Sequence, residues 1–171
     1  PLRRPSSRAG PVTAAHDAPS LHATCIAFGD AGVLLRGPSG AGKSDFALRL
    51  IQAGASLVAD DRVRLRRDGA SVRASAPPGI AGRLEIRGAG LARMACRGDA
   101  ALVLVADLVP PSVLQRLPDP AWCEYLGVRI RSVTIAPFES SSVAKLRIAA
   151  YSAAGREDPM TGARIVRQDE D

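Results

Sequence analysis

The sequence predicts a single α/β domain with a phosphate-binding loop (P-loop) and a mixed central sheet that is rich in hairpins. Residues 37–44 read Gly-Pro-Ser-Gly-Ala-Gly-Lys-Ser, which satisfies the pattern GxxxxGK[ST] between an apolar strand and an amphipathic helix. Residues 101–106 are continuously apolar, as in a central strand covered on both faces. The Asp68-Gly69 pair is a strong hairpin signal. At 171 residues, 46% of them hydrophobic, the chain is long enough to bury one core.

The first third of the chain predicts a leader, a hairpin and a helix. Residues 1–19 are rich in Pro, Ser, Ala and Arg without periodicity, which predicts a disordered leader. Residues 21–28 and 33–36 are apolar and flank a glycine-containing turn, so we expect two paired strands before the P-loop. After the loop, apolar residues recur at helical spacing up to a stop at Gly54.

The middle of the chain predicts short strands. Residues 57–59 form an apolar segment that ends on two adjacent aspartates. Arginines at 62, 64 and 66 then alternate with apolar residues, which predicts a half-buried strand joined by a hairpin to a strand at 71–75. Residues 84–88 are a further candidate strand.

The last third predicts the central strand, another strand and a second helix. Prolines between 110 and 120 leave room for one short helix near 113–116. Residues 128–135 alternate as a strand, and apolar residues from 143 to 150 predict a helix capped by the serines at 140–142. We therefore assign 20–153 to a folded P-loop domain and 154–171 to a partly ordered C-terminal helix or tail.

Composition argues against several functional classes. No apolar run approaches the ~18 residues that span a membrane, and the start of the chain lacks a secretory pattern. A cytoplasmic protein is therefore expected. Cys25, Cys96 and Cys123 lie far apart, without the spacing of a metal site or disulfide framework. We interpret them as small buried apolar residues.

The net charge of +6 is carried almost entirely by arginine, because Lys43 and Lys145 are the sole lysines among 23 basic residues. The arginines are scattered, and aromatic residues make up 4% of the chain. Single-strand nucleic-acid binding uses aromatic platforms, so it is the weaker interpretation. An acidic protein partner fits the charge equally well.

The P-loop motif assigns chemistry to individual residues. Glycines let successive backbone N–H groups point at phosphate oxygens, and the following helix directs its positive dipole end at the same anion. Lys43 is expected to contact the β- and γ-phosphates, and the Ser44 hydroxyl to bind Mg²⁺. The predicted nucleotide-binding residues are Gly37, Pro38, Ser39, Gly40, Ala41, Gly42, Lys43 and Ser44.

A second carboxylate is needed near the metal, and the sequence offers two positions. Asp107 follows the most apolar strand, whereas Asp60 and Asp61 together could divide metal binding and proton transfer. The residues alone favour the pair only slightly. Glu85 and Arg87 share one face if their segment is a strand, either as a surface ion pair or as a metal ligand beside a charge-stabilising arginine.

These motifs in combination resemble one family. His22 lies 21 residues before the P-loop lysine, and Leu-Val-Ala-Asp-Asp-Arg-Val (57–63) and Leu-Glu-Ile-Arg-Gly-Ala-Gly (84–90) follow. The chain resembles the catalytic, C-terminal domain of bacterial HPr kinase/phosphorylase, in the short form without the N-terminal domain. The resemblance runs from His22 to about Ala150 and implies a fold related to phosphoenolpyruvate carboxykinase.

The resemblance implies an ATP- and Mg²⁺-dependent kinase that phosphorylates a serine of HPr or an HPr-like phosphocarrier, in a family that forms hexamers. It implies that Asp61, beside Asp60, is the base. Magnesium would be bound by Ser44, Asp61 and Glu85. The implied catalytic residues are His22, Lys43, Asp60, Asp61, Arg87 and Arg116. The resemblance also implies that Asp107 is not catalytic.

The chain departs from the family at residues 135–142. Long members carry a Pro-Gly-Arg segment linked to the reverse, phosphorylase reaction, whereas this chain reads Ile-Ala-Pro-Phe-Glu-Ser-Ser-Ser. The reverse activity is therefore left open. The alternatives are a small-metabolite kinase or ATPase on a related scaffold, and a nucleotide-responsive binding module that uses the arginines at 62, 64 and 66.

Overall fold

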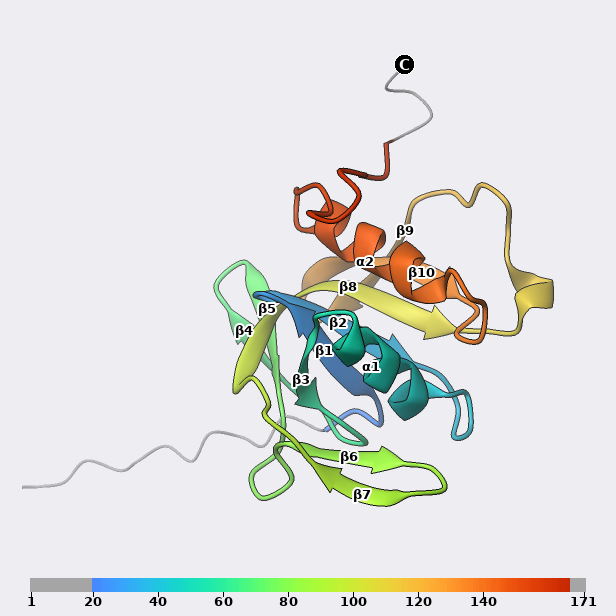
Figure 1. The fold of residues 1–171 in the computed structure, drawn as a ribbon. Coiled ribbons are helices and arrows are strands. Elements are labelled where there is room, and N and C mark those ends of the chain that lie inside the picture. Colours follow the sequence, from blue (N-terminus) through green and yellow to red (C-terminus); the bar gives the residue numbers. More distant parts are fainter. Residues whose placement is uncertain (1–19, 167–171) are drawn as a thin grey trace, which may run out of the picture.

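The computed structural model describes residues 20–166, so the predicted leader and the end of the predicted tail lie outside it. The described chain forms an eight-stranded mixed sheet with two helices and a separate two-stranded hairpin (Figure 1). The strands are β1 Thr24–Phe28, β2 Ala31–Arg36, β3 Ser56–Ala59, β4 Arg64–Asp68, β5 Ser71–Ser75, β6 Arg83–Ile86, β7 Gly90–Arg93, β8 Asp99–Leu108, β9 Ala121–Tyr125 and β10 Val128–Ile135. The helices are α1 Lys43–Gln52 and α2 Ser142–Ala153, and Pro111–Val113 form a turn of 3-10 helix.

The main sheet has the strand order β3-β1-β2-β8-β10-β9. β1 and β2 form the predicted hairpin, with Thr24 opposite Leu35 and Phe28 opposite Ala31. β2 and β10 pair with β8 in parallel, whereas the other pairs are antiparallel. The prediction of a mixed α/β fold with a hairpin-rich sheet is therefore confirmed.

β8 is the strand predicted from the apolar segment 101–106, and it is the longest in the sheet. One of its edges pairs with β2 along most of its length. The other edge pairs first with β5, at residues 99–101, and then with β10, at residues 104–108. The apolar run of the sequence thus results from burial on both faces of this strand.

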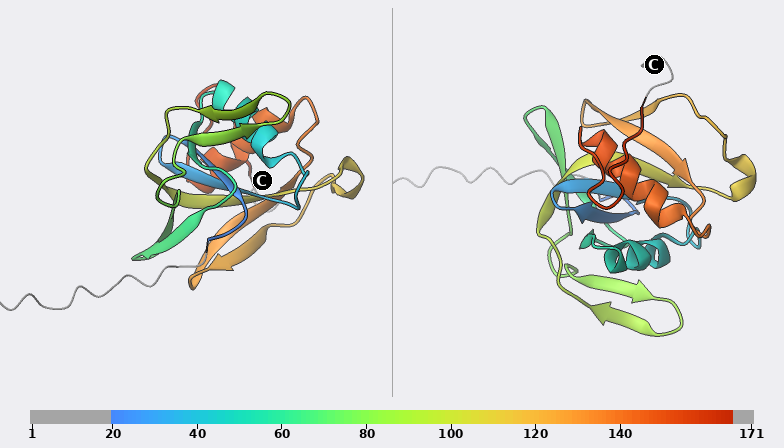
Figure 2. Two further views of the ribbon diagram at one scale, coloured as in Figure 1. Left: turned by 90° about the horizontal axis from the view of Figure 1, so that it is seen from below. Right: turned by 45° about the horizontal axis from the view of Figure 1, so that its top comes forward.

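Alternation along the strands divides the core into two layers. Ile26, Val33 and Leu35 pack with both helices on one face of the sheet. Cys25 and Leu34 face the opposite side, where the β4–β5 hairpin covers them. Figure 2 shows both helices on one side of the sheet, with the β6–β7 hairpin beyond α1. Leu84 of β6 is fully buried in the helix-side layer, which anchors that hairpin next to the P-loop helix.

Several local expectations need correction. The short helix expected at 113–116 is a 3-10 turn that begins at Pro111 and ends at Val113. The serines do not cap α2 by side-chain bonds: Ser141 is the N-cap without such a bond, and the Ser142 hydroxyl donates to the Pro137 carbonyl at 2.9 Å. α2 ends at Ala153, and residues 154–166 contain turns but no helix. β7 and β9 were not predicted.

The cysteine expectation holds for one of three residues. Cys25 is fully buried in β1, and burial raises the pKa of its thiol to about 12. Cys123 is half-buried and Cys96 is exposed, so Cys96 is not the buried apolar residue that we expected. Within residues 20–166, neither helix is long and apolar enough to cross a membrane.

Candidate active site

The P-loop connects the end of β2 to the start of α1, which is the strand–loop–helix order that the sequence predicts. Gly40 and Gly42 have left-handed backbones, with φ of 84° and 90°, which side chains other than glycine rarely tolerate. A Cβ on Gly42 would lie 2.6 Å from the Phe138 ring. Glycine at position 42 therefore suits both the backbone conformation and the close approach of the Phe138 ring.

Lys43 is the first residue of α1 and is 7% exposed. Its ammonium group donates to the carbonyls of Gly37 and Pro38, at 2.8 and 3.0 Å. These bonds hold the positive charge over the loop, beside the first N–H groups of the helix. The start of α1 thus combines a side-chain cation with the positive end of the helix dipole.

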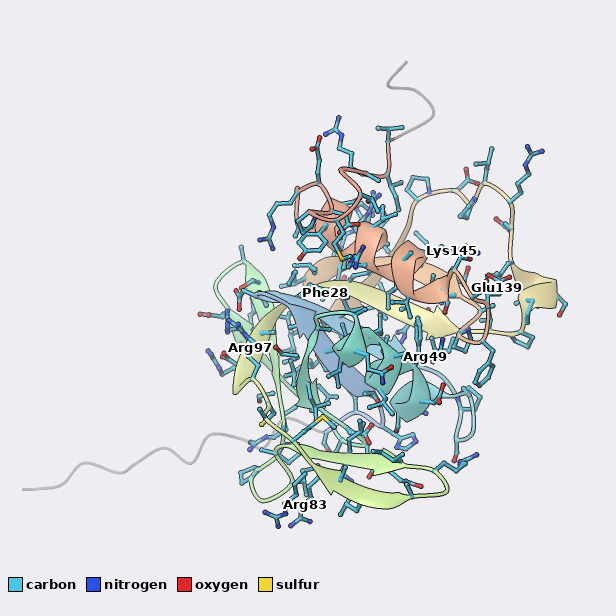
Figure 3. The ribbon with its side chains drawn as sticks, in the orientation of Figure 1. Phe28, Arg49, Arg83, Arg97, Glu139 and Lys145 are labelled. Carbon is cyan, nitrogen blue, oxygen red and sulfur yellow. The ribbon has the colours of Figure 1, made fainter. Side chains whose placement is uncertain are left out.

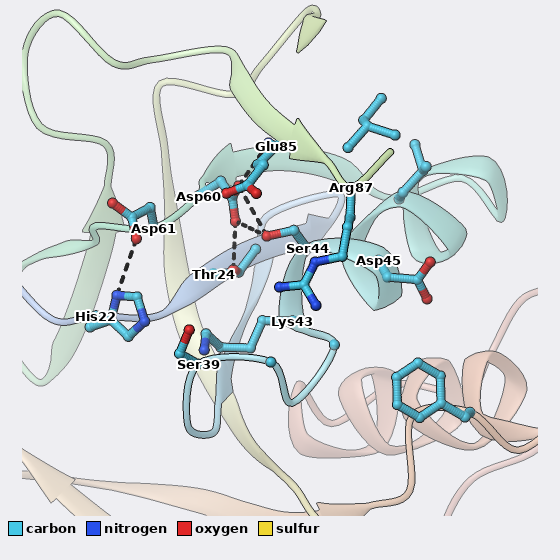
Figure 4. A pocket seen from close by; sticks show the side chains of 15 residues that line it. His22, Thr24, Ser39, Lys43, Ser44, Asp45, Asp60, Asp61, Glu85 and Arg87 are labelled. Atoms are coloured by element: carbon cyan, nitrogen blue, oxygen red, sulfur yellow. Dashed lines mark hydrogen bonds and ion pairs between the residues drawn. The ribbon is translucent and has the colours of Figure 1, made fainter. Parts of the chain in front are cut away.

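The carboxylate of Asp60 lies at the end of β3 and accepts three hydrogen bonds (Figure 4). The donors are the Ser44 hydroxyl at 2.9 Å, the Thr24 hydroxyl at 2.7 Å and the Glu85 backbone N–H at 3.1 Å. Asp60 is 8% exposed. Strand β1, helix α1 and the β6–β7 hairpin therefore converge on this carboxylate.

Asp61 points away from its neighbour. Its backbone φ of 64° is left-handed, and its carboxylate lies 3.1 Å from Nδ1 of His22. Both side chains are more than half exposed. In Figure 4, His22 and Asp61 lie on one side of Lys43, and Asp45 lies on the other. The two adjacent aspartates thus occupy different environments, one buried beside Ser44 and one open to solvent.

Glu85 and Arg87 reach the site from the β6–β7 hairpin. Glu85 lies in β6, whereas Arg87 directly follows it, and both side chains are exposed. Figure 4 shows both on the side of the cleft that faces the P-loop helix. Arg83 of the same hairpin lies away from that cleft, on the outer surface (Figure 3).

These groups line one cleft of about 330 Å³. The structure brings together five of the eight predicted P-loop residues with both aspartates, His22, Glu85 and Arg87. Within residues 20–166, no three His, Cys, Asp or Glu side chains are grouped so that they could hold a metal ion. The lining residues are His22, Thr24, Ser39, Gly40, Gly42, Lys43, Ser44, Asp45, Leu48, Asp60, Asp61, Glu85, Ile86, Arg87 and Phe138.

Of the predicted P-loop residues, Gly37, Pro38 and Ala41 do not line this cleft, and neither do Arg116 and Asp107. Arg116 is exposed on the segment between β8 and β9 and does not line it. Asp107 accepts two hydrogen bonds from Arg36, at 2.8 and 2.7 Å, across the parallel pair β2–β8. This contact, together with the Tyr125 hydroxyl, raises the pKa of the Arg36 guanidinium. Asp107 therefore serves an ion pair at the ends of the two strands.

Thr24 and Phe138 also line the cleft, although neither belongs to the motifs described above. Thr24 lies two positions after His22, so strand alternation could have placed both on one face. Phe138 lies in the segment 135–142 and is 70% exposed at the cleft, an unusual position for a large aromatic residue. Its backbone neighbour Pro137 accepts hydrogen bonds from Arg49 and Ser142, which fix this loop against α1.

The chain is similar in sequence to one family of known proteins. The family model described as HPr Serine kinase C-terminal domain matches residues 14–153. The HPr kinase/phosphorylase of Burkholderia lata is 40% identical over 127 residues, which cover 68% of this chain and 39% of that protein. The HPr kinase/phosphorylase of Burkholderia cenocepacia is 39% identical over 127 residues, which again cover 68% of this chain and 39% of that protein. This chain therefore spans about 39% of the length of these relatives.

A solved structure shows the same fold. The Hpr(Ser) kinase/phosphatase from Coxiella burnetii superposes with a TM-score of 0.66 and 25% sequence identity, covering 74% of this chain and 86% of that chain. The family match covers most of the sequence and includes every residue that lines the cleft. From these matches, the chain belongs to the HPr serine kinase C-terminal domain family.

Proposed function

We propose that this protein is an ATP- and Mg²⁺-dependent kinase that phosphorylates a serine of HPr or of an HPr-like phosphocarrier. One observation carries the proposal. A single cleft combines a P-loop, a buried aspartate bonded to the P-loop serine, and an exposed aspartate beside a histidine. The names of the relatives, HPr kinase/phosphorylase, support the choice of acceptor.

The residues of the cleft fit a magnesium-bound triphosphate. The start of α1 and the Lys43 ammonium offer N–H donors and positive charge to phosphate oxygens. Ser44 and Asp60 present oxygen ligands 2.9 Å apart, as a hard divalent cation requires. Glu85, whose N–H fixes Asp60, adds a further carboxylate at the same edge. When bound, magnesium would neutralise charge on the β- and γ-phosphates.

Asp61 is the general base of this proposal. Its carboxylate is exposed toward the cleft and lies 3.1 Å from His22, which holds it in orientation. It would accept the proton of the acceptor serine as that oxygen bonds to the γ-phosphorus and ADP departs. Asp60 cannot take this role as readily, because three donors already occupy its two oxygens.

Arg87 supports the reaction from the opposite wall. Its guanidinium is exposed at the cleft, beside Glu85 and across from the P-loop (Figure 4). A cation at that place would stabilise the charge of the transferring phosphoryl group. The P-loop, Asp61 and Arg87 thus contribute to one cleft from three separate segments of the chain.

The kinase direction is the one that these residues favour. Residues 137–139 read Pro-Phe-Glu, and Phe138 lies over Gly42 while Glu139 bonds to Lys145 at 2.6 Å. Figure 3 shows Glu139 and Lys145 together at the start of α2. This loop therefore offers no arginine to a second phosphate, and the proposed activity is the transfer of phosphate from ATP to the acceptor serine.

The decisive experiment is phosphotransfer with purified HPr and radiolabelled ATP, followed by mass spectrometry of the acceptor. We expect ATP-dependent labelling of one serine. Asp61→Asn should lower the rate by about 10²–10⁴-fold, the usual contribution of a general base, with ATP affinity nearly unchanged. Asp45→Asn is the matched control, because Asp45 is an exposed carboxylate of the same cleft.

Two outcomes would contradict the proposal. Unlabelled HPr in the presence of protein that binds ATP would remove the proposed acceptor. ATP turnover that HPr does not change would point instead to an ATPase or a small-metabolite kinase.

A further inference from the structure

A second cleft, of about 430 Å³, lies between β8, β10, the turn after β4 and the C-terminal end of α2. It is a consequence of the way β8 changes partners. β5 pairs with β8 up to Ala101, and β10 pairs with it from Leu104 onward. Leu102 and Val103, which lie between these two paired regions of β8, pair with neither β5 nor β10, and they line the cleft. Two strands thus diverge from one edge and leave a wedge between them.

We call this second cleft the fork cleft, and the side chains that line its sides include three arginines. Arg129 and Arg131 lie on β10, and Arg164 lies on the segment that follows α2. Trp122 of β9 stands opposite Arg131, and both β10 guanidinium groups lie over its ring, at 5.1 and 5.2 Å from the centroid. A guanidinium stacked on an aromatic face keeps its edge N–H groups free for an anion.

No acidic residue lines the fork cleft. Elsewhere in residues 20–166, arginines meet carboxylates, as in Arg36–Asp107 and Arg73–Asp99. Arg129, Arg131 and Arg164 have no carboxylate within 4.0 Å in the part of the chain that the structure describes.

One acidic residue of β9, Glu124, lies next to this group of arginines. It stands opposite Arg129 in the β9–β10 pair, but it makes no ion pair with Arg129 and does not line the cleft. Its single charge is outnumbered by the three guanidinium groups.

The walls of the fork cleft are held in place by specific bonds. Arg67 of β4 donates to the Leu126 carbonyl at 3.1 Å, which ties the β4–β5 hairpin to the turn of the β9–β10 hairpin. The Ile165 backbone N–H donates to the Ser152 hydroxyl at 2.8 Å, and that hydroxyl donates to the Ile148 carbonyl at 2.7 Å. These bonds fix the segment that carries Arg164 against the end of α2.

We propose that the fork cleft binds a phosphoryl group, either free phosphate or the phosphate of a small molecule. The guanidinium fork matches phosphate oxygens in geometry, and three cations favour a dianion over a singly charged carboxylate. The cleft is concave, and its volume of about 430 Å³ has room for a compact anion. This inference does not depend on the proposed kinase activity.

The chain contains a built-in reporter for this site. Trp122 is the sole tryptophan of the sequence, so the indole N–H resonance and the tryptophan fluorescence both report on the fork cleft. The experiment titrates the full chain with inorganic phosphate and with glycerol phosphate, in a Lys43→Ala background that disables the P-loop. We expect a saturable shift of the indole resonance. Tighter binding of glycerol phosphate would identify a small phosphorylated molecule, and equal binding would identify free phosphate.

Variants distinguish specific binding in the fork cleft from nonspecific attraction of phosphate to the positively charged protein. Arg164→Gln should weaken binding about tenfold, the usual loss for one charged hydrogen bond, and it leaves the arginines on Trp122 untouched. Arg129→Gln with Arg131→Gln should abolish saturation. Arg93→Gln is the control, because Arg93 is exposed on β7 outside the cleft.

Three results would overturn the inference. One is a shift reproduced by sodium chloride at matched ionic strength, and another is equal saturation by acetate. The third is an unchanged phosphate affinity in both Arg164→Gln and the double variant. Circular dichroism would verify that both variants are folded.

Discussion

Among single residues, Gly42 faces two separate demands. Its φ of 90° disfavours a side chain, and a Cβ there would meet the Phe138 ring at 2.6 Å. Gly40 has a similar φ of 84° but open space around the position of its Cβ. Gly42→Ala should therefore weaken ATP binding more than Gly40→Ala, whose cost is backbone strain of about 1–3 kcal/mol. Calorimetric titration of both variants measures the difference.

The Gly42 prediction has an internal check. Adding Phe138→Ala to Gly42→Ala removes the clash but keeps the strained backbone. The double variant should then bind ATP about as well as Gly40→Ala. Equal binding by the single and double Gly42 variants would show that the contact with Phe138 is irrelevant.

Substitutions of Asp60 and Asp61 should differ in how they change the effect of Mg²⁺ on ATP affinity. Asp60→Asn replaces one acceptor oxygen with a donor beside Ser44, so it should remove the gain in ATP affinity that Mg²⁺ provides. Asp61→Asn should retain that gain, because its carboxylate faces His22. ATP affinities with Mg²⁺ and with EDTA measure the two effects. A normal Mg²⁺ effect in Asp60→Asn would contradict the proposed metal position.

The sequence predicts the membership of the site better than the roles within it. The GxxxxGK[ST] motif predicts the positions of Lys43 and Ser44, because this sequence pattern corresponds to one backbone conformation. The adjacent aspartates look equivalent in sequence, and only the left-handed φ of Asp61 turns one carboxylate away from the other. That angle follows from the folding of β3 and the bond from Arg62 N–H to the Asp60 carbonyl, which residue types alone do not reveal.

At the scale of elements, α2 is joined to the segment after it by a buried ion pair. Arg147 is 8% exposed and Asp158 is fully buried, with Nε 3.0 Å from Oδ1. Arg147→Met would leave the Asp158 carboxylate buried without its cation, at a cost of about 3–5 kcal/mol in the free energy of unfolding. Lys145→Met, which breaks an exposed pair on the same helix, should cost less than about 1 kcal/mol. Urea unfolding would compare the two variants.

Elements with a strong local pattern were predicted, and those that depend on pairing were not. Segment 101–106 is apolar enough to indicate β8 by itself. β9 has the sequence Ala-Trp-Cys-Glu-Tyr, which does not alternate between apolar and polar residues, and β7 is a short strand with one half-buried residue among four. The fork cleft is invisible in the sequence, because it depends on where β8 changes from β5 to β10.

For the whole molecule, acid should destabilise the fold through specific carboxyl groups. Hydrogen bonds from Arg73 lower the pKa of Asp99 below its usual 3.8. Burial acts to raise the pKa of Asp158, but bonds from Thr161 and Arg147 outweigh it, and the pKa is lowered. A carboxyl group with a lowered pKa stabilises the fold above about pH 4, and this stability disappears as the pH falls through its folded-state pKa.

The measurement is the melting temperature between pH 7 and pH 2. We expect it to fall mainly below about pH 4, where the unfolded chain binds protons that the folded chain excludes. Asp99→Asn should make this fall shallower. Asp119→Asn should not, because Asp119 is exposed and has no ion pair among those found in residues 20–166.

The position of Lys43 has a consequence for covalent labelling. The sequence has two lysine side chains, one held on the P-loop carbonyls at 7% exposure and the other, Lys145, half exposed at the surface. A simple amine-acylating reagent would reach Lys145 first. A reagent whose leaving group is a nucleotide phosphate would be delivered to Lys43 instead. The scarcity of lysine thus makes this chain suited to site-directed acylation of its own P-loop, with arginine-rich surfaces left unmodified.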